Sequence, residues 1–581
     1  MMRLLNCEAV LRHALDAAQI TAGDVMEITS LTRATVLGVF SDLVAQGWLE
    51  ELSESGPVPT VRGGRPAKLY QVPSGAGLLV GLDAGEHRMR AAVTDLRGER
   101  RVTRHVVLDA GIVTGRSEEG PGADGGDTGS GGGSDAGVSS CPSGGSGAER
   151  RDASWDPQEV ARERRAAAGK LVAGLLDEIG ARHWNVLAGD LPLPLAVLDR
   201  AALAHNLAWM QDYARQRGVL LAPHGKTTMS PELFAQQLAA GAWGLTFASV
   251  WQARVGVAAG ARRIIIANQV LQDADLDGLD ALLAAVDGLR VWFLVDSAAQ
   301  LALIEDWAAR RGSARVFDVL LEMGMSGQRT GCRSAEEALA LARRLAASRV
   351  ARLGGIECYE GLAARCDDAH DVPAVTALVR SVGAVARGCD AEGLWAPGEA
   401  EILLSAGGSA VFDLVVPLLR LQGLSRPVVG VLRSGCYVTH DHGNYQRFVR
   451  LLARREGLDE TLRPALTVWA QVQSVPEPGL ALLGCGRRDV SFDIDMPLPV
   501  RRAAWGARVA HAVPQGWRIT ALNDQHAYLR FDPEAPGDAA PQVGERVELG
   551  ISHPCTTFDK WRWMPVVDGD GTVTGAIHTC F

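Results

Sequence analysis

The length, composition and charge of the chain set the first limits on its fold and function. Its 581 residues are too many for one domain, and a hydrophobic content of 47% is enough for large buried cores. The formal net charge of -10 argues against a protein that coats nucleic acid or a membrane surface, so any DNA contact must be local. The start of the chain does not resemble a signal peptide, and the ten cysteines are scattered. These features predict a reduced, cytoplasmic protein whose cysteines are free or metal-bound.

Residues 1–75 are predicted to form a winged helix-turn-helix module. Helical spacing predicts short helices over residues 8–18, 21–29 and 32–46. Residues 48–52 and 68–72 are expected to pair as a β-wing with a basic, glycine-containing tip. The residues expected at DNA are Thr32, Arg33 and Thr35 at the start of the third helix and Arg65 in the wing. A small helical bundle with a basic hairpin is the alternative.

This module resembles the winged-helix domain of the ROK family of repressors and sugar kinases, including its Gly-Arg-Pro wing. Residues 78–99, LLVGLDAGEHRMRAAVTDLRGE, resemble the first β-hairpin of that family's actin-like kinase fold, with Asp83 and Gly85 at its first phosphate motif. The resemblance then ends, because a Gly/Ser-rich linker at about residues 115–150 is too poor in apolar groups to fold. Residues 76–183 are therefore predicted to be a truncated ROK-like segment without kinase activity.

Residues 184–440 are predicted to form an α/β domain, a (β/α)8 barrel. Apolar runs of strand length alternate with segments of helical length and composition, and eight βα units that close into a parallel barrel explain this pattern most simply. The runs begin at Val219, Gly244, Arg263, Arg290, Val316, Arg352, Glu401 and Val428. Short strands and turns after this point predict a C-terminal β-rich domain over residues 441–581.

Lys226 is the predicted catalytic residue. Residues 219–230, VLLAPHGKTTMS, have the pattern of a short buried strand that ends on this lysine, and the chemistry of barrel enzymes lies at the carboxyl ends of the strands. Burial at such a position lowers the pKa of an amine, as a lysine needs if it is to form a Schiff base near neutral pH. A surface lysine in a polar loop is the alternative.

Other candidate residues follow later strands at the same end of the barrel. Gly407, Gly408 and Ser409 stand at the amino end of a predicted helix, where backbone N–H groups and the helix dipole favour a phosphate. A phosphate site opposite a lysine is what pyridoxal 5'-phosphate requires, because the lysine joins the aldehyde while the phosphate anchors the far end. Arg329 and Tyr359 are expected near the ring, and loop packing or a surface ion pair are their alternative roles.

A metal site is predicted in the β-rich domain. In an extended His-x-Cys segment, His553 and Cys555 would lie on one side of the strand, where imidazole and thiolate can bind the same Zn2+. A half-buried histidine beside an inert cysteine is the alternative. Two further pairs compete as ligands, namely His440 with His442 after the eighth strand and His578 with Cys580 at the C-terminus, where order is least expected.

Residues 184–581 resemble the D-serine dehydratase-like and D-threonine aldolase-like enzymes, within the fold-type III group whose barrel-plus-β architecture is that of alanine racemase. The resemblance rests on the PH-x-K-T lysine, the R-T-G turn, the Gly-Gly loop and the late H-x-C pair. It implies the following roles: Lys226 as the Schiff-base lysine, Arg329 in the ring-side loop, Gly407, Gly408 and Ser409 at the phosphate, and His553 with Cys555 on zinc.

Three details refine this resemblance. The cysteine of the metal pair favours the dehydratases, because the aldolases typically use a carboxylate there and prefer harder metals. Gln525 precedes His526 where many relatives have glutamate, which leaves the acid–base role of that loop open. The segment GCGRRDVSFDIDMP resembles a bacterial branch called amino acid deaminases.

The predicted function is therefore a pyridoxal phosphate- and zinc-dependent deamination of a small D-amino acid, by β-elimination from a 3-hydroxy amino acid to a 2-oxo acid and ammonia. Tyr437 is placed at the cofactor. Three alternatives stay open: a D-threonine aldolase, a racemase with Tyr437 or Tyr445 as its second acid–base group, and a DNA-binding regulator whose barrel senses an amino acid or pyridoxal phosphate. A homodimer without a membrane partner is expected.

Overall fold

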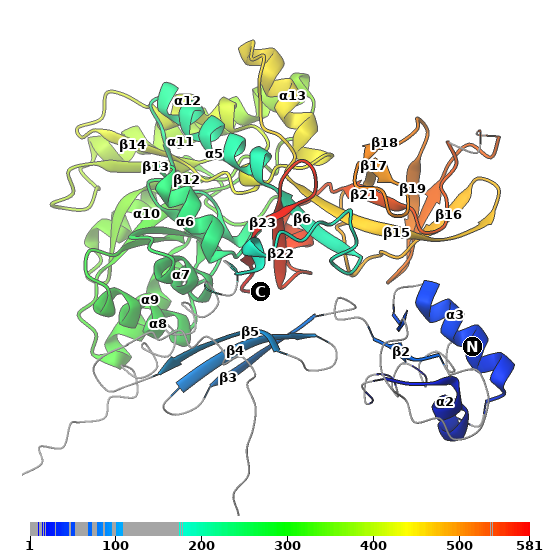
Figure 1. Ribbon diagram of the computed structural model, residues 1–581. Helices are drawn as coiled ribbons and strands as arrows, with labels where there is room; N and C mark the ends of the chain where they lie inside the picture. Colours follow the sequence, from blue (N-terminus) through cyan, green and yellow to red (C-terminus); the bar gives the residue numbers. More distant parts are fainter. Residues whose placement is uncertain are drawn as a thin grey trace, which may run out of the picture. The chain divides into compact units, whose positions relative to one another are not determined.

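The computed structural model in Figure 1 describes residues 21–29, 31–45, 48–52, 68–72, 78–84, 88–95, 100–107, 178–534, 536 and 539–581, together with the single positions 10, 14, 17, 19, 20, 174 and 176. The chain divides into two compact units, Met1–Glu178 and Ile179–Phe581. The predicted Gly/Ser-rich linker, Arg65 and most of the segment before residue 178 lie outside the described residues.

The described part of the first unit contains short helices and antiparallel strands. Helices α2 (Ala22–Thr29) and α3 (Arg33–Ala45) follow two of the predicted helices, and they share a small core with Val25, Val36 and Phe40. Strands β1 (Glu50–Glu51) and β2 (Tyr70–Gln71) pair antiparallel at the predicted wing. A separate antiparallel sheet consists of β3 (Leu78–Ala84), β4 (Arg88–Asp95) and β5 (Arg100–Val107).

The second unit is built on a parallel barrel, and all eight predicted runs form its strands. They are β7 (Leu220–Leu221), β8 (Leu245–Phe247), β9 (Arg263–Gln269), β10 (Arg290–Val295), β11 (Phe317–Met323), β12 (Ala351–Cys358), β13 (Ile402–Ala406) and β14 (Val428–Leu432). The hydrogen-bonded order runs β7-β14-β13-β12-β11-β10-β9-β8. A parallel bridge between His224 and Thr246 joins the two ends of this order, so the barrel closes next to Lys226.

Helices cover the outside of the barrel, as Figure 1 shows. They are α5 (Arg200–Gln216), α6 (Pro231–Ala239), α7 (Val250–Ala258), α8 (Asp273–Ala285), α9 (Ala298–Arg311), α10 (Ala335–Ala347), α11 (Asp368–Ala391) and α12 (Phe412–Leu419), followed by α13 (Asn444–Glu456). Four of them begin at a serine whose hydroxyl accepts a backbone N–H of the first turn, which fixes where each helix starts: Ser230, Ser249, Ser297 and Ser334.

Among the described helices, α11 is the one with the length and hydropathy of a membrane span. In this fold α11 contacts α10, α12 and β12. Its side chains Val375, Val382 and Val385 are completely buried in the barrel's core.

The C-terminal domain is a β-rich sheet, and most of its strands follow the barrel in the chain. Its strands are β15 (Leu466–Glu477), β16 (Leu480–Leu483), β17 (Leu498–Ala503), β18 (His511–Ala512), β19 (Arg518–Leu522), β20 (Ala527–Arg530), β21 (Arg546–Gly550), β22 (Trp563–Val567) and β23 (Val573–His578), with the short helix α14 (Cys555–Phe558) before β22. Strand β6 (Leu195–Asp199) falls in the range predicted for the barrel but belongs to this sheet, because it pairs with β15 and β22 and buries its apolar residues there. The chain therefore enters through the β-rich domain, forms the barrel and returns.

The C-terminus is ordered, although the sequence analysis expected least order there. The backbone N–H of Cys580 donates to the carbonyl of Met229 at 2.8 Å, and Nδ1 of His578 lies 2.6 Å from Oε1 of Glu232. Both partners follow Lys226 closely in sequence. The tail thus holds the segment between the lysine turn and α6.

Replacing Gly225 with alanine should destabilise this fold. An added Cβ would lie 2.4 Å from Cε1 of Phe247 and 2.9 Å from the ring of Phe234, and both rings are completely buried. We expect the free energy of unfolding to fall by about 1–3 kcal/mol, as in other overpacked cores. Gly575→Ala is the control, because a Cβ there meets nothing within 4 Å. Thermal melting curves measure both, and equal melting temperatures for the two variants would contradict the prediction.

Candidate active site

Lys226 stands in the short 3-10 turn η1 (Gly225–Thr227), which follows β7 at the mouth of the barrel. Its neighbours Gly225 and Thr227 are buried, whereas Lys226 itself is exposed. The position at the carboxyl end of a barrel strand is the predicted one, but the expected burial of the amine is absent. The residues on either side of Lys226 in the turn are thus buried, whereas the lysine side chain is exposed at the mouth of the barrel.

Arg329 and Tyr359 contact each other at this mouth. The guanidinium carbon of Arg329 lies 4.6 Å from the centroid of the Tyr359 ring, a cation–π arrangement. Burial, reinforced by the charge of Glu360, raises the pKa of Tyr359 to about 12, so its hydroxyl stays protonated at neutral pH. The pair therefore presents a positive group stacked on a neutral phenol.

A buried ionic network under this mouth was missed by the sequence analysis. Nη2 of Arg433 donates to Oε2 of Glu357, and it also donates to the carbonyl of Cys358 at 2.7 Å. Glu322 accepts from Thr330 Oγ1 at 2.8 Å. Burial raises the pKa of Glu357 to about 7, with Arg433 opposing the shift. A carboxylate inside an otherwise apolar strand run was the signal in the sequence that could have revealed the network.

The predicted phosphate loop has a different set of contacts from the one expected. The backbone N–H groups of Gly407 and Gly408 donate to the Glu360 carboxylate at 3.0 and 2.8 Å, so a buried side chain already takes the donors assigned to a phosphate. The N–H groups of Ser409 and Ala410, just before α12, donate to no described residue. The backbone N–H groups that can bind a phosphate are therefore those of Ser409 and Ala410, which follow the two glycines in the loop.

Two buried nitrogen atoms near the lysine have no partner among the described residues. They are Nδ1 of His224 and Nε of Arg433. Burial and the charges of Lys226, Arg433 and Arg329 lower the pKa of His224 well below its ordinary value. Unpartnered polar atoms in a buried wall call for a polar ligand. Together with the free N–H groups before α12, they fit a phosphorylated heteroaromatic cofactor such as pyridoxal 5'-phosphate.

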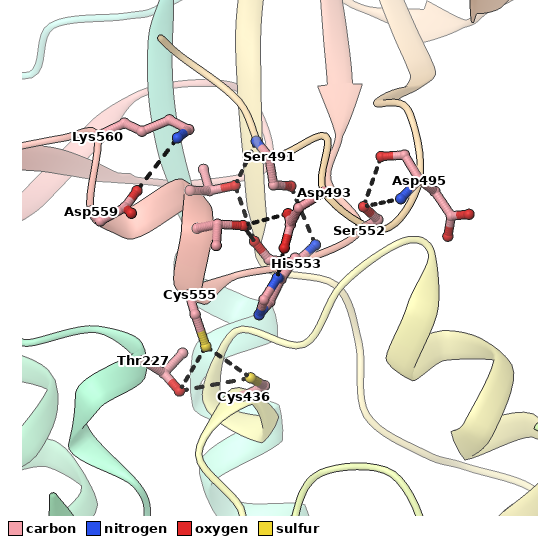
Figure 2. A network of polar contacts seen from close by, with 12 residues as sticks. Thr227, Cys436, Ser491, Asp493, Asp495, Ser552, His553, Cys555, Asp559 and Lys560 are labelled. Atoms are coloured by element: carbon pink, nitrogen blue, oxygen red, sulfur yellow. Dashed lines mark hydrogen bonds and ion pairs between the residues drawn. The ribbon is translucent and has the colours of Figure 1, made fainter. Parts of the chain in front are cut away.

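The predicted metal pair lies beside the lysine turn, as Figure 2 shows. Sγ of Cys555 is 3.4 Å from Oγ1 of Thr227 and 3.7 Å from Sγ of Cys436. Nδ1 of His553 lies 2.5 Å from Oδ2 of Asp493. Pro554 has helical dihedrals and Cys555 begins α14, so the pair does not have the extended geometry that the sequence analysis assumed. Tertiary contacts bring the pair to the site instead.

The electrostatics of this pair favour a thiolate. The Cys436 thiol, followed by His553 and Thr227, lowers the pKa of Cys555 well below its ordinary value in spite of burial. Burial is also outweighed at His553, whose contacts with Cys555 and Asp493 raise its pKa to about 9. The described residues contain no preformed group of three or more His, Cys, Asp or Glu side chains that could hold a metal ion.

The structure separates the other candidates from this centre. Nε2 of His440 is hydrogen-bonded to Gln446. His578 has its Nδ1 at Glu232 and its Nε2 3.6 Å from Sγ of Cys580. Tyr437 is buried in the core, where its hydroxyl accepts from Gln237. Tyr445 contacts the site instead through a hydrogen bond with the Cys436 side chain, and the charge of Cys436, burial and the charge of Cys555 raise its pKa. Gln525 and His526 lie in an exposed loop.

The residues predicted at DNA are only partly described. Thr32 and Arg33 are exposed at the start of α3, and the hydroxyls of Thr32 and Thr35 lie 2.9 Å apart. Arg65 lies outside the described residues. DNA binding by this unit and the homodimer stay predictions from the sequence.

The pKa of Glu357 predicts a pH dependence of stability. The folded chain holds this proton up to a pH of about 7, whereas the ordinary value is 4.5, so the folded state binds more protons between these limits. The contribution to stability is therefore lost as the pH rises through this window, by at most about 1.4 kcal/mol per pH unit. Glu357→Gln should show a smaller fall than the wild type, because burial also raises the pKa of Asp441 to about 7 and that contribution stays. Glu336→Gln, at an exposed glutamate of α10, should keep the full fall. Melting temperatures across the window measure the effect, and parallel curves for wild type and Glu357→Gln would contradict it.

Two family models match the second unit. The model described as "Alanine racemase, N-terminal domain" matches residues 198–445, and the model described as "Putative serine dehydratase domain" matches residues 465–567. The D-threonine aldolase of Arthrobacter sp is 30% identical over 395 residues, which are 65% of this chain and 90% of the relative. The D-threo-3-hydroxyaspartate dehydratase of Delftia sp. (strain HT23) is 28% identical over 392 residues, which are 66% of this chain and 96% of the relative.

Solved structures agree with these matches. The D-threonine aldolase of Filomicrobium marinum has a TM-score of 0.55 at 25% identity, over 67% of this chain and 95% of that chain. Two variants of D-threo-3-hydroxyaspartate dehydratase, both 26% identical, have TM-scores of 0.53 and 0.52 over 69% and 68% of this chain and 97% and 99% of theirs. One replaces a histidine with alanine, and the other, in a metal-free form, replaces a cysteine two positions later. Through its barrel and β-rich domain, the chain belongs to the family of pyridoxal phosphate-dependent lyases with the alanine racemase fold that contains these aldolases and dehydratases.

Proposed function

We propose that the chain is a pyridoxal phosphate- and zinc-dependent D-amino acid dehydratase of the D-serine type, which converts a 3-hydroxy amino acid into a 2-oxo acid and ammonia. The observation that carries the proposal is the contact of Thr227 Oγ1 with Cys555 Sγ at 3.4 Å. Thr227 follows Lys226 directly, so this contact brings the His-x-Cys pair of one domain to the lysine of the other. A β-elimination needs a base at Cα and an acid at the β-hydroxyl, and this contact puts the two candidates side by side.

The barrel side supplies the base and the anchor. Bound pyridoxal 5'-phosphate would supply an electron sink that makes the α-proton acidic. The exposed amine of Lys226 is free to move and takes that proton. The N–H groups of Ser409 and Ala410 hold the phosphate end at the start of α12. The cationic group of Arg329, stacked on Tyr359, would attract the negative charge of the substrate carboxylate.

The β-rich side supplies the acid. Zinc held by His553 and Cys555 would act as a Lewis acid on the β-hydroxyl as it leaves. The Asp493 carboxylate holds Nδ1 of His553 and so leaves Nε2 for the metal, as carboxylates commonly do for metal-binding histidines. The dehydratase variants support this assignment, because their substituted histidine and cysteine have the spacing of His553 and Cys555 and the cysteine variant is metal-free.

Retro-aldol cleavage is the second candidate reaction. The matched D-threonine aldolases favour it, whereas the matched dehydratase and the thiol at position 555 favour elimination. The two reactions break different bonds of the same substrate. With D-threonine, elimination gives a 2-oxo acid and ammonia, and cleavage gives glycine and an aldehyde.

The first test is the visible spectrum of the purified protein, followed by an assay for pyruvate from D-serine with and without a zinc chelator. We expect a bound pyridoxal chromophore and pyruvate formation that the chelator abolishes and zinc restores. Lys226→Ala should lose the chromophore and at least about 100-fold of the activity, since it removes both the attachment point and the base. Lys560→Ala is the matched control, because Lys560 is the other lysine of the second unit.

Other outcomes would count against the proposal. Pyruvate from D-alanine, which has no β-leaving group, would contradict elimination. Glycine and acetaldehyde from D-threonine without ammonia would show that the chain is an aldolase. Chelator-resistant activity would remove zinc from the reaction, and a protein that binds no pyridoxal phosphate would overturn the cofactor assignment.

A further inference from the structure

We propose that Cys436 is a second sulfur ligand of the zinc site, so that two thiolates and one imidazole hold the metal and the fourth position receives the substrate hydroxyl. The inference rests on the proposed function, which puts zinc at His553 and Cys555. It goes further by adding a ligand from the barrel, on the turn η2 (Cys436–Val438) that follows β14. Two cysteines and a histidine with one open position form a known type of catalytic zinc site.

The distance between the two sulfur atoms carries this inference. Sγ of Cys436 lies 3.7 Å from Sγ of Cys555. Two thiolates bound to one tetrahedral zinc at about 2.3 Å each stand about 3.8 Å apart, whereas the atoms of a disulfide are about 2.05 Å apart. The two sulfurs are therefore not bonded to each other, and they already have the separation that one zinc ion imposes.

Two contacts and the close packing of the neighbouring Gly435 fix Cys436 in this place. Its backbone N–H donates to Oγ of Ser409 at 3.1 Å, and its sulfur lies 3.7 Å from Oγ1 of Thr227. Gly435 permits the approach, because an added Cβ would stand 2.5 Å from the carbonyl oxygen of His224 and 2.8 Å from Thr227 Oγ1. The side chain is 4% exposed. Thr227 thus touches both sulfurs, and the cysteine cannot turn away without disturbing the lysine turn.

The third ligand is His553. Its Nδ1 is engaged by Asp493, so the other ring nitrogen is the one available to a metal, and Figure 2 shows the ring above the two sulfurs. The described residues hold no preformed group of three ligands, so the sulfur pair carries the inference and the imidazole must close onto it. The His553 side chain is 21% exposed, so neighbouring residues do not fully enclose the ring that has to move.

A second thiolate changes what the metal does. Two thiolates and a neutral imidazole cancel the charge of Zn2+, and soft sulfur ligands select zinc or cadmium over manganese or magnesium. With a single thiolate the site would keep a positive charge and accept harder metals. The presence of Cys436 therefore predicts a site that prefers soft metals.

The test is zinc X-ray absorption spectroscopy on the full-length protein loaded with one equivalent of zinc. We expect two sulfur neighbours at about 2.3 Å in the wild type and one in Cys436→Ser or Cys555→Ser. Cys366→Ser, which removes a half-buried thiol outside this group, should keep two. Competition with a chelator should show zinc affinity lowered at least about tenfold in Cys436→Ser, with a shift of preference toward Mn2+.

The outcomes separate this inference from the function on which it rests. One sulfur neighbour in the wild type, unchanged in Cys436→Ser but lost in Cys555→Ser, would overturn the role of Cys436 and leave zinc at His553 and Cys555. A wild type without sulfur-bound zinc would overturn both. A disulfide between the two cysteines, detected as two missing thiols in the unfolded protein before reduction, would also overturn the inference. The wild-type spectrum decides the question even if a variant fails to fold.

Discussion

The close contact of two turns at the mouth of the barrel is the constraint on which the site depends. Strand β7 pairs with β14 through Leu220–Val431 and Leu221–Leu432, so the turns η1 and η2 that follow these strands leave the barrel side by side. Gly435 lets them meet, since any side chain there would strike the carbonyl oxygen of His224. Barrel closure and site assembly are therefore the same event, because the bridge from His224 to Thr246 that completes the barrel also fixes the residue before the lysine turn.

The path of the chain explains how a second domain reaches this mouth. Strand β6 precedes the barrel in the chain and β15 follows it. The two strands pair with each other, so both ends of the barrel are anchored in one sheet. The C-terminal residues add a further restraint on the segment after Lys226, because the backbone N–H of Cys580 donates a hydrogen bond to the carbonyl of Met229. With the barrel held on both sides, the segment that carries His553 and Cys555 has a fixed position relative to Lys226. A barrel alone would carry Lys226 without the His553–Cys555 pair that we propose as its catalytic partner.

The sequence predicted the barrel well because its strands are buried on both faces and read as apolar runs, and all eight runs were found. The sequence also placed Lys226, Arg329 and Tyr359 at one end of the barrel, because residues that follow the carboxyl ends of parallel strands lie at the same end. It could not predict contacts between residues far apart in the chain. Glu360 on the glycine loop, Cys436 beside Cys555 and Asp493 behind His553 all depend on tertiary packing, and no local spacing encodes them. Tyr437 was preferred to Tyr445 for the same reason, because which of two nearby tyrosines faces the core is decided by the turn between them.

Hydrogen bonds connect the proposed phosphate loop with the turn that carries Cys436. The hydroxyl of Ser409 accepts the backbone N–H of Cys436, while the backbone N–H of Ser409 remains available at the start of α12. Ser434 in turn donates to the carbonyl of Gly408 at 2.7 Å. Each of these two segments, the loop proposed to hold the phosphate and the turn that carries Cys436, thus donates a hydrogen bond to the other. The two segments are therefore expected to move together. A cofactor anchored on one side would have its reacting end positioned against a metal on the other by hydrogen bonds within the protein itself, which lowers the ordering cost of binding.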